Sequence, residues 1–552
     1  MRKKHNSFRS ITCRQGLFMI FFILFFAVSH YSALAQYKYE SPRDSEDWVD
    51  GYPDGCTSIT VAKKASDGGW VSTSHTCDSH RTRAWIDITA QDTHKKGDVI
   101  TTVKRTKDDT QAMPSYKHIP VGDIPQVEKT FGYINTAYPC MNQYQLAIGE
   151  STFGGRESLR SDNGLIDCQQ LIHLLMQRCK TAREAIKLAG ELTREYGYID
   201  EGECLTIADK DEVWHLEITG AGRGERGSVW VAQRVPDDHI SVNANASRIR
   251  EIDLDDPDYF MASENIYTVA QDSGWWNPED GPFEFCYAYS PESRGSFASR
   301  RREWRVFDLV APSLNLHPNA ENYPFSVKPD TLITMEKLVH IFKDYFQGTE
   351  FDMTKNITWT NAEGKTEISP LANPFMPYDM NPLFKINGGW GWRGERPIAR
   401  WYTMYATITQ SRDWLPDEIG GVVWLAFDNV ASSIYTPLYS CITDVPESFK
   451  TPARKTGFSR KSAWWAFNRT GTLAAQRWGD MRHDLNEVWE PMQKELFDKQ
   501  NTIENKALEL YQANRKKARR FLTDYSMKWG QDVVAKSWEL GDQLWTKYDE
   551  KF

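Results

Sequence analysis

The chain has 552 residues, a length that predicts three or four structural units at roughly 150 residues each. Hydrophobic residues make up 40%, aromatic residues 13% and charged residues 26% of the chain, a composition that excludes disordered and collagen-like proteins. The net charge of −9 offers no basic field for a phosphate backbone. We therefore expect a globular protein that does not bind nucleic acid.

The N-terminus has the pattern of a secretory signal peptide. Five Lys and Arg residues precede an apolar run from Leu17 to Val28, and Ala33-Leu34-Ala35 gives the small-x-small ending that a processing peptidase requires. The apolar run has 12 residues, too few for a helix to cross about 30 Å of hydrocarbon. We expect residues 1–35 to be removed and the protein to be exported, to the periplasm or the medium; the alternative is an uncleaved membrane anchor. No later segment has 18 uninterrupted apolar residues, so no membrane span is expected after processing.

Nine cysteines are present, and Cys13 would leave with the signal peptide. The spacings of the others match no zinc pattern such as C-x-x-C with a second pair, so no metal is expected. An exported chain can form disulfides, and the sequence leaves the pairing open. The remaining cysteines are Cys56, Cys77, Cys140, Cys168, Cys179, Cys204, Cys286 and Cys441.

Strand and helix signals alternate after residue 56 and predict an α+β fold with antiparallel sheets. Residues 57–63 and 69–76 are β-rich and joined through Asp67-Gly68, which predicts a hairpin with Cys56 at its head. Asp167 and Thr181 each open a capping box before an amphipathic run, which predicts two helices. Further strands are expected at 144–151, 204–208, 213–218, 228–235 and 240–245.

The rest of the chain has three other textures. Residues 36–55 are polar without a hydrophobic period and predict an extended leader. Residues 310–450 are rich in Pro, Trp and Asn and predict irregular structure wrapped on the core. From about Ser459 a 3.6-residue period of apolar residues predicts a C-terminal helical extension.

Cys56, in Asp54-Gly55-Cys56-Thr57, is the most informative residue for chemistry. The sequence contains no Gly-x-Ser-x-Gly, Walker loop or His-Glu-x-x-His, and no glycine fingerprint between an expected strand and an expected helix. If the Gly55–Cys56 bond is cut, Cys56 carries both a thiol and a free α-amine. An α-amine with a reference pKa of about 7.7–8.0 can serve as the general base for the thiol. The alternative is an ordinary buried or disulfide-bonded cysteine at the start of a strand.

The segment from Cys56 to Gly68, followed by Ser74-His75-Thr76-Cys77-Asp78, resembles the opening of the dipeptidase family of N-terminal-nucleophile cysteine hydrolases, which is related to penicillin V acylases and bile-salt hydrolases. The resemblance runs from residue 56 to about 440. The further stretches that carry it are Met141-Asn142-Gln143-Tyr144, Ala147 to Thr152, Ala244-Asn245, Arg302-Glu303-Trp304, Gly348 to Asp352, Leu415-Pro416 and Gly420 to Trp424.

The resemblance implies roles for three residues at the reaction centre. Cys56 matches the nucleophile, and Asp78 matches the aspartate that binds the α-amine and raises its pKa through the opposite charge. Asn245 matches the asparagine whose side-chain amide donates to the oxyanion. Loss of one such donor typically costs about 10²–10³ in rate.

The resemblance also implies roles near the reaction centre for three further residues. Arg302 corresponds to the arginine near the nucleophile, although Arg300, Arg301 and Arg305 lie in the same stretch. Glu150 falls near the position of a second oxyanion or substrate contact. His75 stands where the acylases have an arginine, and either His75 polarises the thiol or Arg302 does so alone.

The sequence therefore predicts an exported, self-processed cysteine dipeptidase whose substrate is a short peptide and which needs no cofactor. The resemblance implies a four-layer αββα sandwich. Two alternatives stay open: a hydrolase of the same fold that cleaves a non-peptide amide, and a secreted, aromatic-rich binding protein without catalysis. The expected segments are a signal peptide (1–35), a leader (36–55), a peptidase domain (56–450) and a helical extension (451–552).

Overall fold

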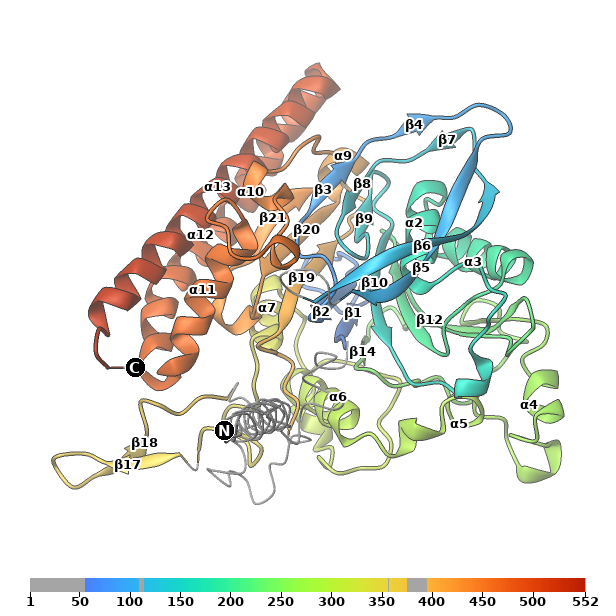
Figure 1. The fold of residues 1–552 in the computed structure, drawn as a ribbon, viewed down its shortest axis with the longest axis horizontal. Helices are drawn as coiled ribbons and strands as arrows, with labels where there is room; N and C mark the ends of the chain where they lie inside the picture. Colours follow the sequence, from blue (N-terminus) through green and yellow to red (C-terminus); the bar gives the residue numbers. More distant parts are fainter. Residues whose placement is uncertain (1–54, 109–113, 356, 375–394, 552) are drawn as a thin grey trace, which may run out of the picture. The chain divides into compact units, whose positions relative to one another are not determined.

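Antiparallel strand pairing organises most of the chain in the computed structural model, which describes residues 55–108, 114–355, 357–374 and 395–551 (Figure 1). These residues lie within one compact unit, Pro53–Phe552. The predicted signal peptide, and the predicted leader apart from Gly55, lie outside the described residues. The predicted α+β class is confirmed, because the paired strands form antiparallel ladders and the helices occur in separate blocks.

The largest sheet has eight strands in the order β15-β13-β12-β11-β10-β9-β8-β3. Its central strands are almost completely buried, and Glu150 of β10 lies opposite Leu205 of β11. The strands expected between residues 144 and 235 are confirmed within three residues at each end. The strands are β3 (Asp87–Thr89), β8 (Tyr133–Asn135), β9 (Met141–Asn142), β10 (Ala147–Thr152), β11 (Glu203–Ala208), β12 (Val213–Gly220), β13 (Ser228–Arg234) and β15 (Phe260–Ala262).

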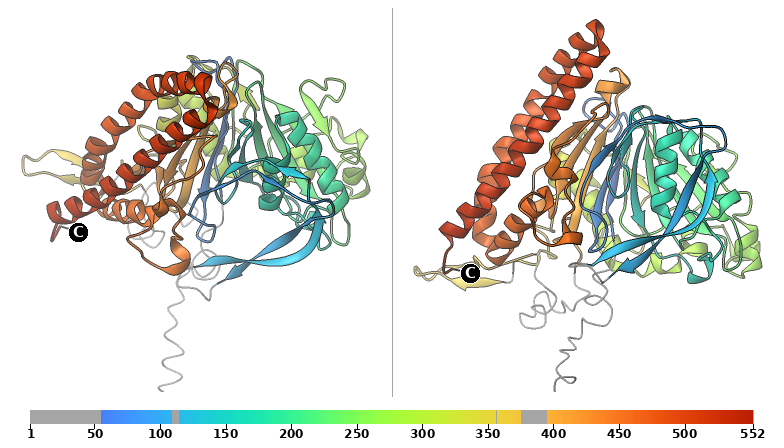
Figure 2. Two further views of the ribbon diagram at one scale, coloured as in Figure 1. Left: turned by 90° about the horizontal axis from the view of Figure 1, so that it is seen from above. Right: turned by 45° about the horizontal axis from the view of Figure 1, so that its top comes forward.

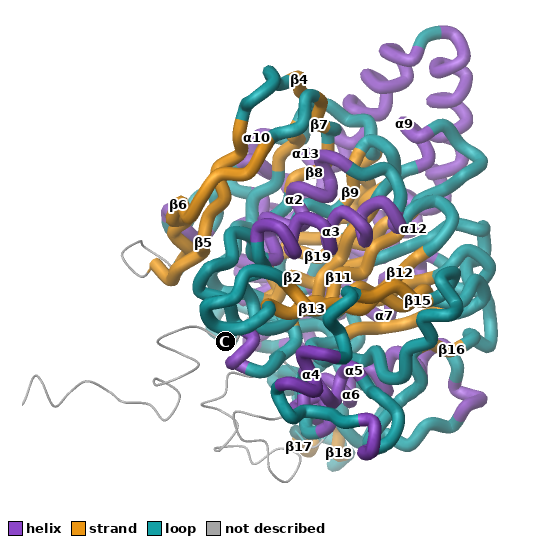
Figure 3. The backbone as a smooth tube through the Cα atoms, turned by 90° about the vertical axis from the view of Figure 1, so that its right-hand side faces the viewer, coloured by secondary structure: helices purple, strands orange, loops and turns teal. Residues whose placement is uncertain are grey.

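Both predicted helices are present and lie over this sheet: α2 (Cys168–Arg178) and α3 (Ala182–Tyr196) (Figure 3). The Asp167 side chain accepts from the Gln170 N–H at 2.8 Å. The Thr181 hydroxyl accepts from the Glu184 N–H at 3.2 Å. Each cap satisfies an N–H that has no partner within its own helix, which is why both helices begin where the sequence predicts.

A second sheet, in the order β2-β19-β20-β21, packs against the C-terminal helices (Figure 2). The prediction of irregular structure for residues 310–450 is wrong here, because three of these strands lie between Thr403 and Tyr439. They are buried along their whole length and lack the polar–apolar alternation that marks a half-exposed strand. The elements are β2 (Ser74–Asp78), β19 (Thr403–Gln410), β20 (Val422–Phe427), β21 (Thr436–Tyr439), α11 (Ala463–Gln476), α12 (Trp478–Ala513) and α13 (Arg515–Lys547).

The predicted hairpin at Cys56 is correct for the positions of its strands and wrong for their sheet. Backbone bonds join Val61 to Ser72, but β1 (Ser58–Val61) pairs with β14 (Ile240–Asn243) and β2 pairs with β19. Side chains explain the divergence: the Ser74 hydroxyl bonds to both the N–H and the carbonyl of Ile59. These side-chain bonds replace ladder bonds, so each strand completes its pairing in a different sheet.

One large cluster of buried apolar side chains extends from both sheets to the C-terminal helices and includes Trp214, Trp424 and Trp489. The eight cysteines of the described residues are buried, and none of them forms a disulfide. Within the part of the chain that the structure describes, no helix combines the length and apolar character that a membrane crossing requires.

The other strands and α-helices of the described residues range from short strands such as β4 to the 14-residue helix α6. They are β4 (Asp92–Thr93), β5 (Val99–Asp108), β6 (Ser115–Pro125), β7 (Lys129–Thr130), β16 (Ser326–Val327), β17 (Thr358–Thr360), β18 (Thr366–Ile368), α4 (Thr268–Asp272), α5 (Phe285–Tyr289), α6 (Phe297–Val310), α7 (Met335–Phe342), α9 (Asp417–Gly420) and α10 (Glu447–Lys450).

Candidate active site

Cys56 lies two residues before β1, where the backbone is fixed by the end of β2. The Gly55 N–H donates to the Asp78 carbonyl, and the Asp78 N–H donates to the Gly55 carbonyl, each at 2.9 Å. The Cys56 side chain is only 4% exposed. These bonds hold the peptide bond between Gly55 and Cys56 beside β2. The thiol of Cys56 points into the protein.

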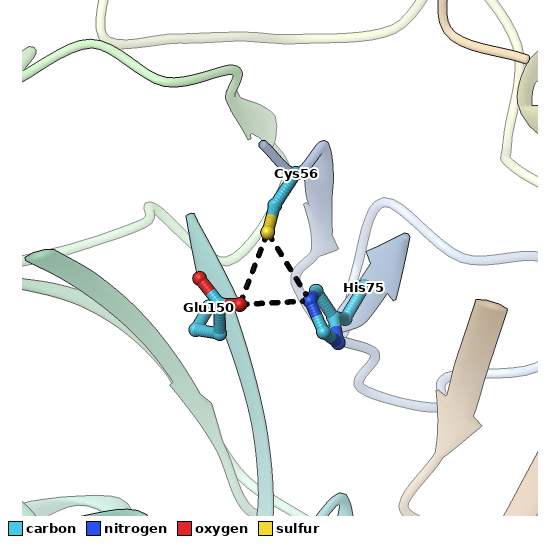
Figure 4. Close-up of side chains that lie close together, drawn as sticks. All are labelled: Cys56, His75 and Glu150. Carbon is cyan, nitrogen blue, oxygen red and sulfur yellow. Dashed lines mark hydrogen bonds and ion pairs between the residues drawn. The ribbon is translucent and has the colours of Figure 1, made fainter. Parts of the chain in front are cut away.

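The thiol meets His75 and Glu150, which come from two different strands (Figure 4). Cys56 Sγ donates to Glu150 Oε1 at 3.0 Å, and His75 Nε2 lies 3.4 Å from the same sulfur. His75 Nε2 is also 3.0 Å from Glu150 Oε1. The three groups thus form a closed triangle, with one nitrogen of His75 facing both the sulfur and the carboxylate.

Burial sets the protonation of this triangle. Burial and the neighbouring Glu150 carboxylate raise the pKa of the Cys56 thiol well above its usual value. Burial also acts to raise the pKa of Glu150, but the charge of His75 and the hydrogen bonds from His75 and Cys56 outweigh it and lower that pKa. Near neutral pH the thiol is protonated and Glu150 is ionised, so the thiol needs a base before it can attack a carbonyl.

A second carboxyl group, Glu203, lies behind Glu150 on the same face of the sheet. Glu203 is opposite Thr152 in the β10–β11 register, which makes it a diagonal neighbour of Glu150. Burial, followed by the charge of Glu150, raises the pKa of Glu203 well above its usual value. Glu150 Oε2 and Glu203 Oε1 are buried without a conventional donor among the described residues. The raised pKa favours a protonated Glu203 beside the ionised Glu150.

Asp78 is fully buried at the end of β2, where its carboxylate accepts from the Thr76 hydroxyl at 3.4 Å and binds two side chains from far along the sequence. Arg396 Nη2 lies 2.9 Å from Asp78 Oδ2, and the Thr403 hydroxyl donates to Asp78 Oδ1 at 2.6 Å. Burial raises the pKa of Asp78, while Arg396 and the Thr403 hydrogen bond act against it. The predicted contact of Asp78 with an α-amine concerns a processed chain and stays a prediction.

Asn245 lies just after β14 in the left-handed region, with φ of 60°. Its Oδ1 accepts from the Cys56 N–H at 3.1 Å, and its Nδ2 donates to the Thr152 carbonyl at 2.7 Å. An amide nitrogen has two hydrogens, so one remains for a substrate oxygen. The predicted role in the oxyanion hole requires that second hydrogen.

Arg302 of α6 ties the nucleophile segment to the Asn245 loop. Its Nη1 donates to the Cys56 carbonyl at 2.7 Å, and its Nη2 donates to Asn245 Oδ1 at 3.0 Å. Its three neighbours in the arginine run bond elsewhere: Arg300 to Ala320, Arg301 to Glu395 and Arg305 to Asp344. Arg302 is thus the member of the run that contacts Cys56, and it touches the carbonyl rather than the sulfur.

Arg396, Thr403 and Glu203 were not expected at the site. Arg396 and Thr403 are 318 and 325 residues from Asp78 in the sequence, so no local pattern links them. Glu203 is an acidic residue at the head of an apolar strand, a position where a solvent-exposed side chain is the ordinary interpretation. The sequence gives no sign that the Glu203 side chain is buried, and only its burial marks it as part of the site.

Comparisons with known proteins give a family match that covers the residues of this site. The sequence model of Peptidase family C69 matches residues 55–491, so the match begins one residue before Cys56. A probable dipeptidase of Latilactobacillus sakei is 25% identical over 437 residues, which cover 77% of this chain and 82% of that protein. A probable dipeptidase B of Lactococcus lactis subsp. lactis is 27% identical over 371 residues, 65% and 69% of the two chains. Dipeptidase A of Lactobacillus helveticus is 22% identical over 426 residues, 76% and 81%.

Proposed function

The chain belongs to peptidase family C69, and from this premise we propose that it is a cysteine dipeptidase with Cys56 as the nucleophile. The observation that carries the proposal is the Cys56 thiol, buried and within hydrogen-bonding distance of Glu150 and His75. The relatives named as dipeptidases support a dipeptide or very short peptide as the substrate.

We propose that the exported chain first cleaves itself between Gly55 and Cys56. Cys56 Sγ attacks the carbonyl carbon of Gly55, the C–N bond breaks, and the amine of Cys56 is released as a thioester forms. Water then hydrolyses the thioester and restores the thiol. Two contacts support this step: Glu150 lies where it can take the thiol proton, and the Asp78 N–H already donates to the Gly55 oxygen that would carry negative charge.

In the processed enzyme the free α-amine of Cys56 takes the thiol proton and later delivers it to the leaving amine of the substrate. The thiolate attacks the scissile carbonyl, and Asn245 Nδ2 and backbone N–H groups bind the oxyanion. Hydrolysis of the acyl-enzyme thioester releases the second product. Glu150 is ionised and cannot donate to an oxyanion, so its contact with the sulfur supports a role in orienting the thiol.

The four-layer αββα sandwich is part of this proposal. The contacts of α2 and α3 with the eight-stranded sheet, and of α11, α12 and α13 with the four-stranded sheet, support it. Contacts between β2 and β10 support direct packing of one sheet on the other. The boundary between a peptidase domain and a helical extension at residue 450 stays a prediction.

N-terminal sequencing of the purified protein, together with its intact mass, tests the maturation step. A chain that starts at Cys56 is the expected result. A fully active chain that starts at Gln36 would contradict the α-amine mechanism and leave Glu150 or His75 as the base.

Hydrolysis of a free dipeptide by Cys56→Ser tests the nucleophile. We expect this variant to fold and to lose nearly all activity, because a hydroxyl is far harder to ionise than a thiol near neutral pH. Cys441→Ser, which removes a buried thiol beside the C-terminal helices, is the matched control and should remain active. Full activity of Cys56→Ser would end the assignment.

A further inference from the structure

Three atoms at the head of β1 lie as close together as the ligands of one metal ion (Figure 4). The edges of the triangle are 3.0 Å from Cys56 Sγ to Glu150 Oε1, 3.4 Å from that sulfur to His75 Nε2, and 3.0 Å from the nitrogen to the carboxylate oxygen. All three side chains are buried. The cluster is thus built into the fold and does not depend on mobile surface side chains.

The size of the triangle fits a tetrahedral ion. Zinc bonds of about 2.3 Å to sulfur and about 2.0 Å to nitrogen or oxygen place ligand atoms roughly 3.3–3.6 Å apart at tetrahedral angles. The observed edges are shorter by a few tenths of an ångström. Small side-chain rotations therefore suffice to admit an ion, without a change in the strands.

The chemistry of the three ligands selects the kind of ion. A thiolate and an imidazole favour Zn²⁺ and related transition metals, whereas Mg²⁺ and Ca²⁺ prefer all-oxygen sites. When the thiol proton is released to solvent, the thiolate and the Glu150 carboxylate together balance the charge of a divalent cation. A neutral complex is the least costly one to bury.

We propose that Cys56, His75 and Glu150 bind one Zn²⁺ ion and that this ion reversibly inhibits the enzyme. The metal–sulfur bond replaces the S–H bond, and the proton goes to solvent. The sulfur lone pair that would attack a carbonyl is then engaged by the metal. Three protein ligands leave one coordination position open.

The fourth position links the site to maturation, and this step rests on the proposed function. In the intact chain the Cys56 nitrogen is an amide whose N–H donates to Asn245 Oδ1. After cleavage the same nitrogen is an amine that can chelate the ion together with Sγ. We therefore expect the processed enzyme to bind zinc more tightly than an uncleaved chain does.

Cobalt binding tests the site without any use of activity. Processed protein, stripped with a chelator and dialysed, is titrated with Co²⁺, and the thiolate-to-cobalt absorption band is followed; Zn²⁺ affinity is then measured by competition. We expect one equivalent of metal, and an affinity at least roughly 100-fold lower for Glu150→Gln and His75→Ala, because loss of a direct ligand should exceed the effect of an outer-shell change. Cys441→Ser should bind as the wild type does.

Protection of Cys56 from alkylation by iodoacetamide provides a second measurement for variants that fold poorly. Zinc should slow alkylation of the wild-type protein, and removal of zinc by a chelator should restore it. Absence of one-equivalent binding, or binding unchanged in both Glu150→Gln and His75→Ala, would overturn the site. Activation of hydrolysis by zinc would overturn the inhibitory role.

Dipeptide hydrolysis in the presence of the chelator separates this inference from the proposed function. Activity in chelator without metal binding refutes the zinc site and leaves the dipeptidase assignment intact. Metal binding at the three residues, with no hydrolysis in chelator, supports the site and refutes the dipeptidase.

Discussion

Asp78 shows how the environment of a single carboxylate determines what its loss would cost. One oxygen pairs with Arg396 and the other accepts from Thr403, and the side chain has no exposed surface. Arg302 lies close enough to Arg396 for each positive charge to disfavour the other. The negative charge of Asp78 therefore stabilises the buried Arg302 and the half-buried Arg396 close to each other.

We expect Asp78→Asn to lower the free energy of unfolding by about 2–4 kcal/mol, because the substitution leaves Arg396 without its counterion. Thr403→Val is the matched control: it removes a hydrogen bond to the same carboxylate, keeps the charge pair, and should cost about 1 kcal/mol. Urea unfolding of both variants at neutral pH measures the difference. A cost for Asp78→Asn no larger than that of Thr403→Val would show that the charge pair contributes little.

Glu203 offers a second prediction at the scale of one residue. Burial and the charge of Glu150 raise the pKa of Glu203 well above its usual value, which favours the neutral form of Glu203. Glu203→Gln keeps a neutral hydrogen-bond donor beside Glu150 and should hold kcat/KM within about threefold of the wild type. Glu203→Leu removes the donor and should lower kcat/KM by about tenfold or more, because an ionised Glu150 loses a partner.

The pH dependence of kcat/KM distinguishes this explanation from a purely structural one. The acidic limb of the pH profile of kcat/KM should shift along the pH axis in Glu203→Leu and keep its wild-type position in Glu203→Gln. This result would support a proton shared by Glu203 and Glu150. If Glu203→Gln were as inactive as Glu203→Leu, Glu203 would have to act in its ionised form.

At the scale of elements, local signals proved reliable and long-range pairing did not. The caps at Asp167 and Thr181 depend on hydrogen bonds within four residues, so the sequence alone places both helices. The partner of β1 is β14, whose paired residues are about 180 positions away, and no local pattern specifies that choice. For the candidate site, the sequence pointed to His75 and Glu150 only through family resemblance, and to Cys56 also through its place after a possible leader. Arg396 and Thr403 reach Asp78 through strand order, which the sequence pattern did not reveal.

The loop after β14 is held by Glu217 of β12, and this clamp predicts a pH effect on stability. Glu217 Oε1 accepts from the N–H groups of Arg248 and Ile249, and its other oxygen accepts from Ser247. The same loop carries Asn245. Burial raises the pKa of Glu217 to about 7 in spite of these hydrogen bonds.

A carboxyl group whose pKa is raised in the folded state stabilises the protein below its unfolded pKa, and this contribution is lost as pH rises through the folded value. The free energy of unfolding should therefore contain a term from Glu217 that declines from about pH 4.5 to about pH 7. Glu217→Gln does not titrate, so its stability should fall by about 2 kcal/mol less than that of the wild type over this range. Urea unfolding of both proteins at pH 5 and at pH 8 measures the difference. An equal change in the free energy of unfolding between the two pH values would contradict the assignment.

At the scale of the whole molecule, the C-terminal helices are joined to the sheet that carries Asp78. Arg412, two residues after β19, forms two hydrogen bonds of 2.8 and 2.7 Å with Glu504 of α12, and both side chains are buried. The Tyr439 hydroxyl of β21 donates to the same carboxylate. Packing of α13 on β21 continues this contact (Figure 2). The helices thus support the strands on which β2 depends for its pairing.

The enclosure of the site within the whole molecule also bears on the selectivity for short peptides. Glu150 and Arg302 carry opposite charges near Cys56, so they are the first candidates for binding the two charged ends of a dipeptide. In the structure the Glu150 carboxylate binds His75 and Cys56, and Arg302 donates to four backbone or side-chain oxygens around Cys56 and Asn245. Both charges are used internally. Selectivity for short peptides would then arise from the enclosure of the thiol, which is 4% exposed, and from charged groups other than these two.

We expect N-acetylated dipeptides, C-amidated dipeptides and peptides of five or more residues to be cleaved at least roughly tenfold more slowly than the free dipeptide, a difference of about 1.4 kcal/mol in transition-state stabilisation. The reason is that a buried site discriminates strongly against a charged group left without its partner and against chain that cannot enter. Measurement of kcat/KM over this panel is the test. If the Glu150 carboxylate orients the thiol, as its contacts with Cys56 and His75 support, Glu150→Gln should lower all values together. If Glu150→Gln lowers kcat/KM more for free dipeptides than for acetylated dipeptides, Glu150 binds the substrate ammonium group. Equal kcat/KM values of the wild-type enzyme for all substrates in the panel would favour a broader amidase.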